Sequence, residues 1–381
     1  MVDTKLCVAP FRNAVINTDG LMMPCCDFVN DLATPTPTHT IKDIDSWWAE
    51  GLDSLRKDMN EGRVNPGCAN CISKESNKQY RSVRQNLNSQ YTQVDEPRLE
   101  RLEIRVSNYC NLSCIMCGPY ASSAIASEYQ KHEAAYHKIG MVGAYEPTIR
   151  WWDDADSIRN LKGQMSKVTH LSFAGGEPLI VPEVIDLLNS IDDGHIKDIH
   201  ITTNLTRVTD KFLNAIKRFN NVGIAVSLEG IADHNNYVRH GSKWADIENN
   251  ISTLKNLNNV TLRINHVLQH TSIFALPQLI EYADRHQLPV SLHEVAYNSY
   301  PEAGVLTINS AHPNDVTKFN LWLTNYQGQY KQQLSNWVES YQFDNNLYTK
   351  FHAYVIMIDN IRGVSFNKTF SPTYKEETSG T

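Results

Sequence analysis

Three cysteines that lie within eight residues, shortly after a strand-like run, most strongly constrain the fold of this chain. The run covers residues 102–106, and the cysteines are Cys110, Cys114 and Cys117, in a C-x3-C-x2-C pattern. A [4Fe–4S] cluster usually takes four thiolates, so three thiolates leave one iron open to a substrate or cosubstrate. Barrel enzymes place their chemistry at the ends of such strands. The pattern therefore predicts a catalytic cluster on an α/β scaffold.

Zinc binding and chance clustering are the two alternatives for the triplet. A zinc knuckle usually shows C-x2-C pairs or cysteine combined with histidine, whereas the first gap here has three residues and no fourth ligand lies nearby in the sequence. A chance cluster of cysteines requires only that the protein reside in a reducing compartment. Neither alternative accounts for the position of the triplet after a strand.

With this spacing the chain resembles the radical S-adenosylmethionine (SAM) superfamily. The resemblance implies that the open iron chelates the amino and carboxylate groups of the methionine moiety of SAM. Reductive cleavage of SAM then yields a 5′-deoxyadenosyl radical that abstracts hydrogen from a substrate. The residue before the third cysteine is commonly aromatic in the family, and here it is Met116. Methionine is apolar and adaptable, so it can pack in place of the aromatic ring.

All eight cysteines lie in the first 117 of 381 residues. Disulfide frameworks are typical of small secreted chains, so this asymmetry favours metal sites in the N-terminal third. The net charge of −7 does not suggest a nucleic-acid or anionic-membrane surface. The start of the chain lacks the apolar stretch of a signal peptide, and no apolar run approaches the ~18 residues of a transmembrane helix. We expect a cytoplasmic protein with no membrane partner and no nucleic-acid partner.

The five remaining cysteines predict a second metal site. An Asp-Gly pair that ends at Gly20 lies between apolar runs and is typical of a hairpin, which would bring Cys7 close to Cys25. A C-x2-C pair at Cys68 and Cys71 follows a predicted helix and a Pro-Gly turn. Four thiolates suit either zinc or a fully ligated [4Fe–4S] cluster.

The spacing C-x12-G-x4-C, followed later by C-x2-C, is similar to the auxiliary-cluster module called SPASM, or to its shortened form, twitch. The resemblance covers about residues 5–75, so the module is expected over residues 1–75, and it implies an auxiliary [4Fe–4S] cluster. Family spacing selects Cys25 and leaves Cys26 as the spare cysteine, so the implied ligands are Cys7, Cys25, Cys68 and Cys71. Modules of this type usually follow the barrel, whereas this one precedes it.

After a polar linker over residues 76–97, strand and helix patterns alternate, as in parallel α/β folds. Six strands are predicted, over residues 102–106, 168–173, 199–203, 222–227, 261–268 and 290–295. Helices are predicted over residues 44–60, 183–191, 210–219, 244–257 and 276–285. Six strands suit the partial (β/α)6 TIM-like barrel of the family over residues 98–300, since a closed barrel needs eight. Residues 301–381 are expected to form a C-terminal helical extension and tail.

A long connection over residues 119–166 contains a turn with two tryptophans and two aspartates, ending at Asp154. It can serve as a substrate lid or, more commonly, as structural cover. Near the C-terminus, residues 359–363 read Asp-Asn-Ile-Arg-Gly and resemble a closing segment of twitch-type relatives. The sequence assigns no role to that segment.

A glycine-rich turn at Gly175, Gly176 and Glu177 ends the second strand of the predicted barrel. Glycines allow a backbone to approach a ligand closely, and a carboxylate can accept hydrogen bonds from an ammonium group. Taken alone, Gly-Gly-Glu-Pro is only a turn. Its position one strand after the cysteines matches the family motif for the amino group of SAM.

Polar residues also end the third and fourth strands. Asn204 can contact the cofactor or substrate, or serve only a turn. Ser227 and Glu229 resemble the ribose-contacting Ser-x-Asp-Gly of the family, with Glu in place of Asp. His234 and Arg239 resemble a His…Arg pattern of related enzymes, in which Arg239 could pair with the SAM carboxylate. A surface arginine is the simpler alternative for Arg239.

The sequence thus predicts a radical SAM enzyme that acts on a peptide or protein, because SPASM-like relatives often do. One alternative is a radical SAM enzyme that acts on a small metabolite, sugar or nucleoside. Another is a non-catalytic iron–sulfur or zinc-binding electron-transfer or adaptor protein, which would not need the Gly-Gly-Glu-Pro turn or a ribose motif. A reductant such as flavodoxin or ferredoxin is the expected partner. No general acid or base can be nominated.

Overall fold

The computed structural model describes residues 7–29, 39–77, 82–91, 96–141, 150–191, 194–295 and 301–370. The chain divides by its internal contacts into two compact units. The first unit comprises residues 1–109, 149–202 and 209–223, and the second comprises residues 110–148, 203–208 and 224–381.

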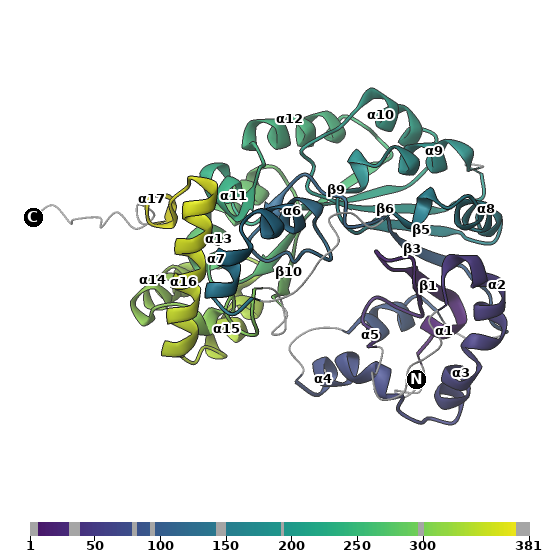
Figure 1. Cartoon of the computed structure of the whole chain (residues 1–381), viewed down its shortest axis with the longest axis horizontal. Helices are drawn as coiled ribbons and strands as arrows, with labels where there is room; N and C mark the ends of the chain where they lie inside the picture. The colour runs from purple at the N-terminus through teal and green to yellow at the C-terminus, as the bar shows by residue number, and fades with distance from the viewer. Residues whose placement is uncertain are drawn as a thin grey trace, which may run out of the picture. The chain divides into compact units, whose positions relative to one another are not determined.

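The first unit is built on strands in the order β2-β1-β3-β5-β6. These strands are β1 (Asn13–Ile16), β2 (Met22–Met23), β3 (Arg101–Arg105), β5 (His170–Ala174) and β6 (Asp198–Thr203). The strands β1, β3, β5 and β6 run parallel, and β2 pairs antiparallel with β1. Leu102 and Ile104 are buried while their neighbours in β3 are half-buried, as expected for the two faces of a strand. The helices α8 (Ala155–Gln164), α9 (Pro182–Ser190) and α10 (Asp210–Ile216) lie beside these strands (Figure 1).

The hairpin predicted around Gly20 is confirmed, since Val15 lies opposite Met23 and Gly20 has a φ of 82°. Residues 44–60 form α2 (Ile44–Ser46), the π-helical turn η2 (Trp47–Gly51) and α3 (Asp53–Asn60). The sequence did not predict that β1 pairs in parallel with β3, with Val15 opposite Glu103. The cysteine-rich segment therefore contributes a strand to the parallel sheet. The domain boundaries at residues 75, 97 and 300 stay predictions.

The second unit contains β7 (Val222–Ser227), β9 (Val260–Leu268) and β10 (Val290–Glu294), in the order β7-β9-β10. Its helices include α11 (Ala232–Val238), α12 (Trp244–Lys255) and α13 (Ser272–Arg285). The C-terminal part is helical, with α14 (Pro313–Asn325), α15 (Lys331–Glu339), α16 (Asn345–Arg362) and α17 (Phe366–Phe370); α16 and α17 are drawn in yellow in Figure 1.

The predicted fold class is confirmed as an open, mostly parallel α/β architecture. All six predicted strands are present, as β3, β5, β6, β7, β9 and β10. Among the described residues, β2 and β10 each have a single neighbouring strand, so the strands do not close into a barrel. The sequence missed a two-stranded sheet of β4 (Ser113–Cys114) and β8 (Arg239–His240), because two-residue strands carry no periodic signal.

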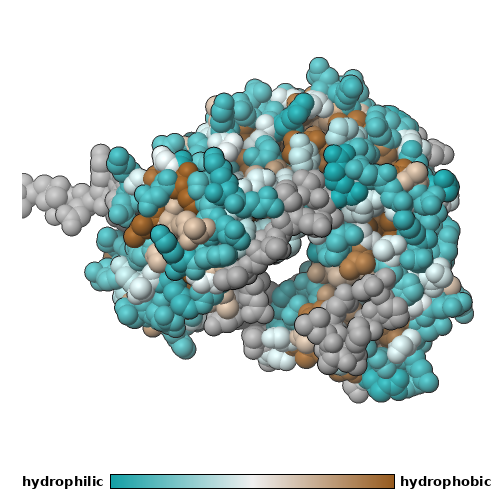
Figure 2. Space-filling view, in the orientation of Figure 1, coloured by the Kyte–Doolittle hydropathy of each residue, from teal (hydrophilic) through white to brown (hydrophobic). Residues whose placement is uncertain are grey.

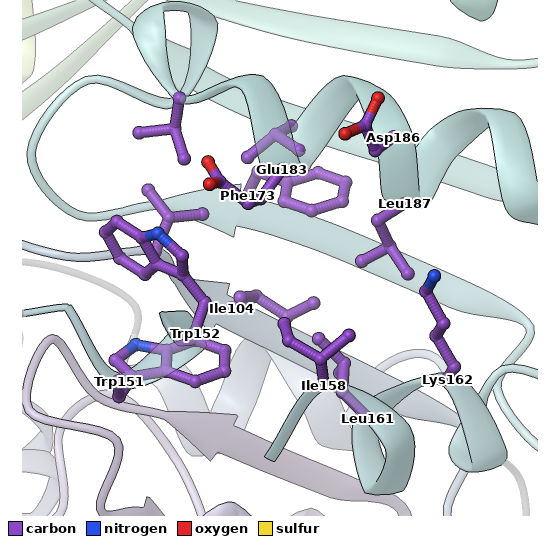
Figure 3. A pocket seen from close by; sticks show the side chains of 13 residues that line it. Ile104, Trp151, Trp152, Ile158, Leu161, Lys162, Phe173, Glu183, Asp186 and Leu187 are labelled. Atoms are coloured by element: carbon purple, nitrogen blue, oxygen red, sulfur yellow. The ribbon is translucent and has the colours of Figure 1, made fainter. Parts of the chain in front are cut away.

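The turn with two tryptophans covers one face of the sheet in the first unit. It forms η4 (Trp151–Asp153), and Trp152 is buried. Figure 3 shows Trp151 and Trp152 with Ile104 and Phe173 of the strands around a cavity of about 150 Å³, which α8 and α9 complete. Asp154 caps α8 by accepting a hydrogen bond from the Ser157 amide at 2.7 Å. These contacts are those of structural cover.

Apolar residues on the face seen in Figure 2 form small patches separated by hydrophilic ones. The large exposed apolar side chains of the described residues are correspondingly scattered, at Val29, Val64, Tyr109, Tyr120, Leu321, Phe343 and Ile356. No helix within the described ranges is long and apolar enough to cross a membrane.

Candidate metal and cofactor site

The three clustered cysteines lie on a loop of the second unit that the small sheet holds in place. Cys114 lies opposite Arg239 in the antiparallel β4–β8 pair, and the Ile115 amide donates a hydrogen bond to the Val238 carbonyl at 2.9 Å. The Cys117 amide donates to the Cys114 carbonyl at 3.1 Å. The loop therefore turns back on itself between its last two cysteines.

The N-terminus of α6 (Ser123–Lys131) fixes the other end of the loop. Ser122 caps this helix by accepting a hydrogen bond from the Ile125 amide at 3.3 Å, and its hydroxyl donates to the Leu112 carbonyl at 2.7 Å. The Cys110 amide donates to the Ser123 hydroxyl at 3.1 Å. Helix caps of this kind satisfy backbone groups that would otherwise lack partners.

Asn204, a predicted cofactor contact, lies beside the same loop. Its Nδ2 is 3.9 Å from the Cys110 Sγ and donates to the Asn111 Oδ1 at 3.0 Å. Its own Oδ1 accepts hydrogen bonds from the Thr206 amide at 3.0 Å and the Thr206 hydroxyl at 2.8 Å. The side chain thus joins the turn after β6 to the cysteine loop.

Arg239 connects the cysteine loop to a buried polar network. Its Nη1 is 3.7 Å from the Cys114 Sγ, and its Nη2 donates to the Glu229 Oε1 at 2.7 Å. The other carboxylate oxygen of Glu229 accepts from the Val267 amide at 3.1 Å and lies 3.3 Å from the His266 Nδ1. Arg239 and Glu229, both predicted SAM contacts, are therefore joined to each other.

The thiols of this loop differ in acidity. A hydrogen bond from the Cys117 thiol, together with the charge of Arg239, lowers the pKa of Cys114 to about 7. The pKa of Cys117 is raised because its thiol is the donor in that pair and is buried. Three thiols beside a cation are a donor set that suits an iron–sulfur cluster, whose ligands must be deprotonated.

Helix α16 braces the cysteine loop. It contains most of the segment over residues 359–363, to which the sequence assigned no role. The Tyr354 hydroxyl donates to the carbonyl of Ile115 at 2.9 Å. Arg362 donates to both carboxylate oxygens of Glu128 in α6, at 3.0 and 2.9 Å. These contacts join positions more than 200 residues apart, which no local pattern could reveal.

The glycine-rich turn lies in the first unit and packs against the backbone at Tyr109. Gly175 has a φ of 88°, which disfavours any other residue. A Cβ at Gly176 would collide with the Tyr109 carbonyl, and the Glu177 amide donates to that carbonyl at 2.8 Å. The glycines are therefore required by protein packing, a reason that the sequence motif does not reveal.

Two further residues singled out in the sequence lie in the second unit. Ser227 ends β7 and is buried. His234 stacks on Phe370 with ring centroids 5.0 Å apart, and its Nε2 is 3.1 Å from the Thr369 carbonyl oxygen. His234 therefore packs against α17.

Four of the five N-terminal cysteines line one cavity of about 330 Å³ in the first unit. They are the four predicted ligands, Cys7, Cys25, Cys68 and Cys71. Cys26 does not line this cavity. Its backbone carbonyl oxygen lies 3.5 Å from the Arg105 Nη2. Burial, together with the nearby charge of Glu103, raises the pKa of the Cys26 thiol to about 12.

The thiols around this cavity are poor acids. Burial raises the pKa of Cys7 to about 12 and that of Cys68 to about 11, and it also raises the pKa of Cys25. A metal would therefore have to displace protons from neutral thiols. In the part of the chain that the structure describes, no three Cys, His, Asp or Glu side chains converge closely enough to hold a single metal ion.

The middle of the chain matches a known protein family. The family model described as "Radical SAM superfamily" matches residues 104–272. A "Probable GTP 3',8-cyclase" of Methanocaldococcus jannaschii is 25% identical over 191 residues, which cover 48% of this chain and 55% of that protein. A "Probable GTP 3',8-cyclase" of Methanothermobacter marburgensis is 28% identical over 112 residues, covering 29% of this chain and 30% of that one.

Solved structures align with this chain at low identity. Streptococcus suis SuiB bound to the precursor peptide SuiA aligns with a TM-score of 0.39 and 15% identity, covering 82% of this chain and 65% of that chain. The match of this chain extends over little more than half of the M. jannaschii relative. The region that matches the radical SAM superfamily model, residues 104–272, contains the cysteine loop, the glycine-rich turn and Arg239.

Proposed function

We propose that this protein is a radical SAM enzyme whose catalytic [4Fe–4S] cluster is held by Cys110, Cys114 and Cys117. The observation that carries the proposal is the cysteine loop itself, within the matched domain and beside Arg239. When bound, the cluster and SAM supply a 5′-deoxyadenosyl radical that takes hydrogen from a substrate. The protein's part is to hold the thiolates, orient SAM and exclude water.

The SAM contacts are the proposed role of the glycine-rich turn, Asn204 and Ser227. Glu177 is buried, and its carboxylate already accepts a hydrogen bond from the Leu179 amide at 3.0 Å. An ionised carboxylate can accept several hydrogen bonds, including those of an ammonium group. Glu229 and Arg239 are also predicted to contact SAM. Any such contact has to leave intact the buried ion pair that joins these two side chains.

An auxiliary [4Fe–4S] cluster is the proposed occupant of the cavity lined by Cys7, Cys25, Cys68 and Cys71. Zinc holds its thiolates about 2.3 Å from one point, whereas these thiols surround a cavity of about 330 Å³. A four-iron cluster fills more space and takes its four thiolates from a wider ring. The separation of Cys26 from the cavity supports the proposed ligand set.

The lead substrate is a peptide or protein, which rests on the SPASM-like cysteine spacing. The alternative is a small metabolite, sugar or nucleoside, and the similarity to two probable GTP 3',8-cyclases favours it. A non-catalytic iron–sulfur or zinc protein is the third possibility. A cytoplasmic location, with flavodoxin or ferredoxin as the electron donor, completes the proposal.

The test is SAM cleavage by anaerobically reconstituted protein with a strong reductant. We expect 5′-deoxyadenosine to form, and we expect peptides to raise its yield and to transfer deuterium to it when they are labelled. Nucleoside triphosphates form the second arm of the screen. Wild-type protein that holds no SAM-cleaving cluster would support the non-catalytic alternative.

A further inference from the structure

The positively charged side chain of Arg239 lies beside the thiol of Cys114, a proposed ligand of the SAM-binding cluster. Its Nη1 lies 3.7 Å from the Cys114 Sγ, and a contact of this length to sulfur is a hydrogen bond to a large acceptor atom. The β4–β8 pairing places Arg239 directly opposite Cys114, so the backbone itself sets this approach.

A second nitrogen of the Arg239 guanidinium binds a buried carboxylate. Nη2 donates to the Glu229 Oε1 at 2.7 Å, while Glu229 and Arg239 side chains are 0% and 10% exposed. The Nε of Arg239 has no hydrogen-bond partner among the described residues. An arginine fork can satisfy a carboxylate and a thiolate at once with fixed geometry, which lysine cannot do.

Glu229 is in turn fixed from β9. Its Oε2 accepts from the Val267 amide at 3.1 Å and lies 3.3 Å from the His266 Nδ1, which pairs with the Leu228 carbonyl oxygen at 3.0 Å. The Nε2 of His266 pairs with the Ser272 hydroxyl at 2.9 Å. The chain of contacts therefore runs from Ser272 through His266, Glu229 and Arg239 to Cys114, entirely within the second unit.

Hydrogen bonds and charges at the thiolate sulfurs are among the groups that set the reduction potential of a cluster. A reduced cluster carries one more negative charge, so a cationic donor stabilises the reduced state. We infer that Arg239 tunes the reduction potential of the SAM-binding cluster through Cys114, and that Glu229 and His266 are positioning residues for it. This inference rests on the proposed function, and it gives Arg239 and Glu229 a role other than direct contact with SAM.

Two variants should shift the potential in opposite directions. E229Q removes the negative partner and keeps the cation, so the midpoint potential should rise. The double variant R239M/E229Q removes the cation without leaving a buried carboxylate unpaired, which would be costly, so the potential should fall. We expect about a tenfold change in the equilibrium constant for reduction in each case, which is about 59 mV for a one-electron couple.

A matched control is the other buried ion pair of this unit, Arg362 with Glu128, which makes no hydrogen bond to a cysteine in any described contact. The double variant R362M/E128Q should shift the potential less than R239M/E229Q does. The measurement is a redox titration monitored by electron paramagnetic resonance. It records the signal of the cluster whose spectrum changes when SAM is added. Iron content and SAM affinity by calorimetry are measured in parallel.

Opposite shifts in E229Q and R239M/E229Q, at wild-type iron content, would support the inference. An unchanged potential in both variants would overturn it. Weakened SAM binding without a shift in potential would also overturn it, and would support the predicted SAM contact instead. A wild-type protein with no cluster that responds to SAM would defeat the proposed function itself, before any variant is compared.

Discussion

The two groups of cysteines in this protein lie in different chemical surroundings. Four of the five in the first unit line a cavity, and burial raises the pKa of Cys7 and of Cys68. Those of the second unit lie on a braced loop, where a hydrogen bond from Cys117 and the charge of Arg239 lower the pKa of Cys114. The two groups differ in that burial governs the acidity of the enclosed thiols, whereas a neighbouring thiol and a cation govern that of Cys114.

The largest effect is expected from removing a ligand of the braced loop. Cys114→Ala should abolish 5′-deoxyadenosine formation, because the remaining two thiolates cannot hold a SAM-binding cluster. The measurement is product analysis by liquid chromatography after anaerobic reconstitution. Cys26→Ala is the matched control, since Cys26 lies outside the proposed ligand set, and it should retain wild-type yield. Equal yields from the two variants would rule out the assignment.

Removing a ligand of the enclosed cavity should have a smaller and separate effect. Cys68→Ala should lower the iron content from about eight to about four per chain, because only the auxiliary four-iron cluster is lost. SAM cleavage should persist. Metal analysis by mass spectrometry checks this result. About four irons and one zinc in the wild type would instead identify the cavity as a structural zinc site.

Acid should weaken the brace of the second unit through His270. This imidazole stacks on Phe351 of α16 with ring centroids 3.6 Å apart, and burial lowers its pKa to about 3. The unfolded chain binds the proton near pH 6.5 and the folded chain does not. Stability from this group is therefore present above pH 6.5 and declines as the pH falls toward 3, by up to about 1.4 kcal/mol per pH unit.

Denaturant unfolding of the protein at pH 7.0 and pH 5.5 measures this effect. The His270→Gln variant should show a shallower loss of stability over the same interval, because its side chain does not titrate. If the two proteins lose the same free energy of unfolding, His270 is not the group that responds to acid.

The smallest expected effect comes from one hydrogen bond of the brace. Tyr354→Phe removes the hydroxyl that donates to Ile115 and should cost about 1 kcal/mol, with faster loss of iron from the SAM-binding cluster. Tyr341→Phe is the matched control, because the Tyr341 hydroxyl also donates to a backbone carbonyl, that of Ala311, at 2.9 Å. Iron release at the same rate in both variants would show that the brace does not protect the loop.

The sequence predicted the parts of this protein that depend on local patterns. Strand-like runs that alternate with helical patterns located all six strands, because these signals are local in the sequence. The family resemblance selected Cys7, Cys25, Cys68 and Cys71, which line one cavity that Cys26 does not line, and their role as cluster ligands stays a prediction. The hairpin at Gly20 followed from its turn chemistry.

Only the tertiary structure decided what surrounds these elements. It pairs β1 in parallel with β3, places Arg239 opposite Cys114, and joins Tyr354 to Ile115. It also shows that Gly176 is required by the nearby Tyr109 carbonyl. Each of these contacts joins residues far apart in the chain, so its free energy depends on how whole elements pack, and no local period or motif records that packing.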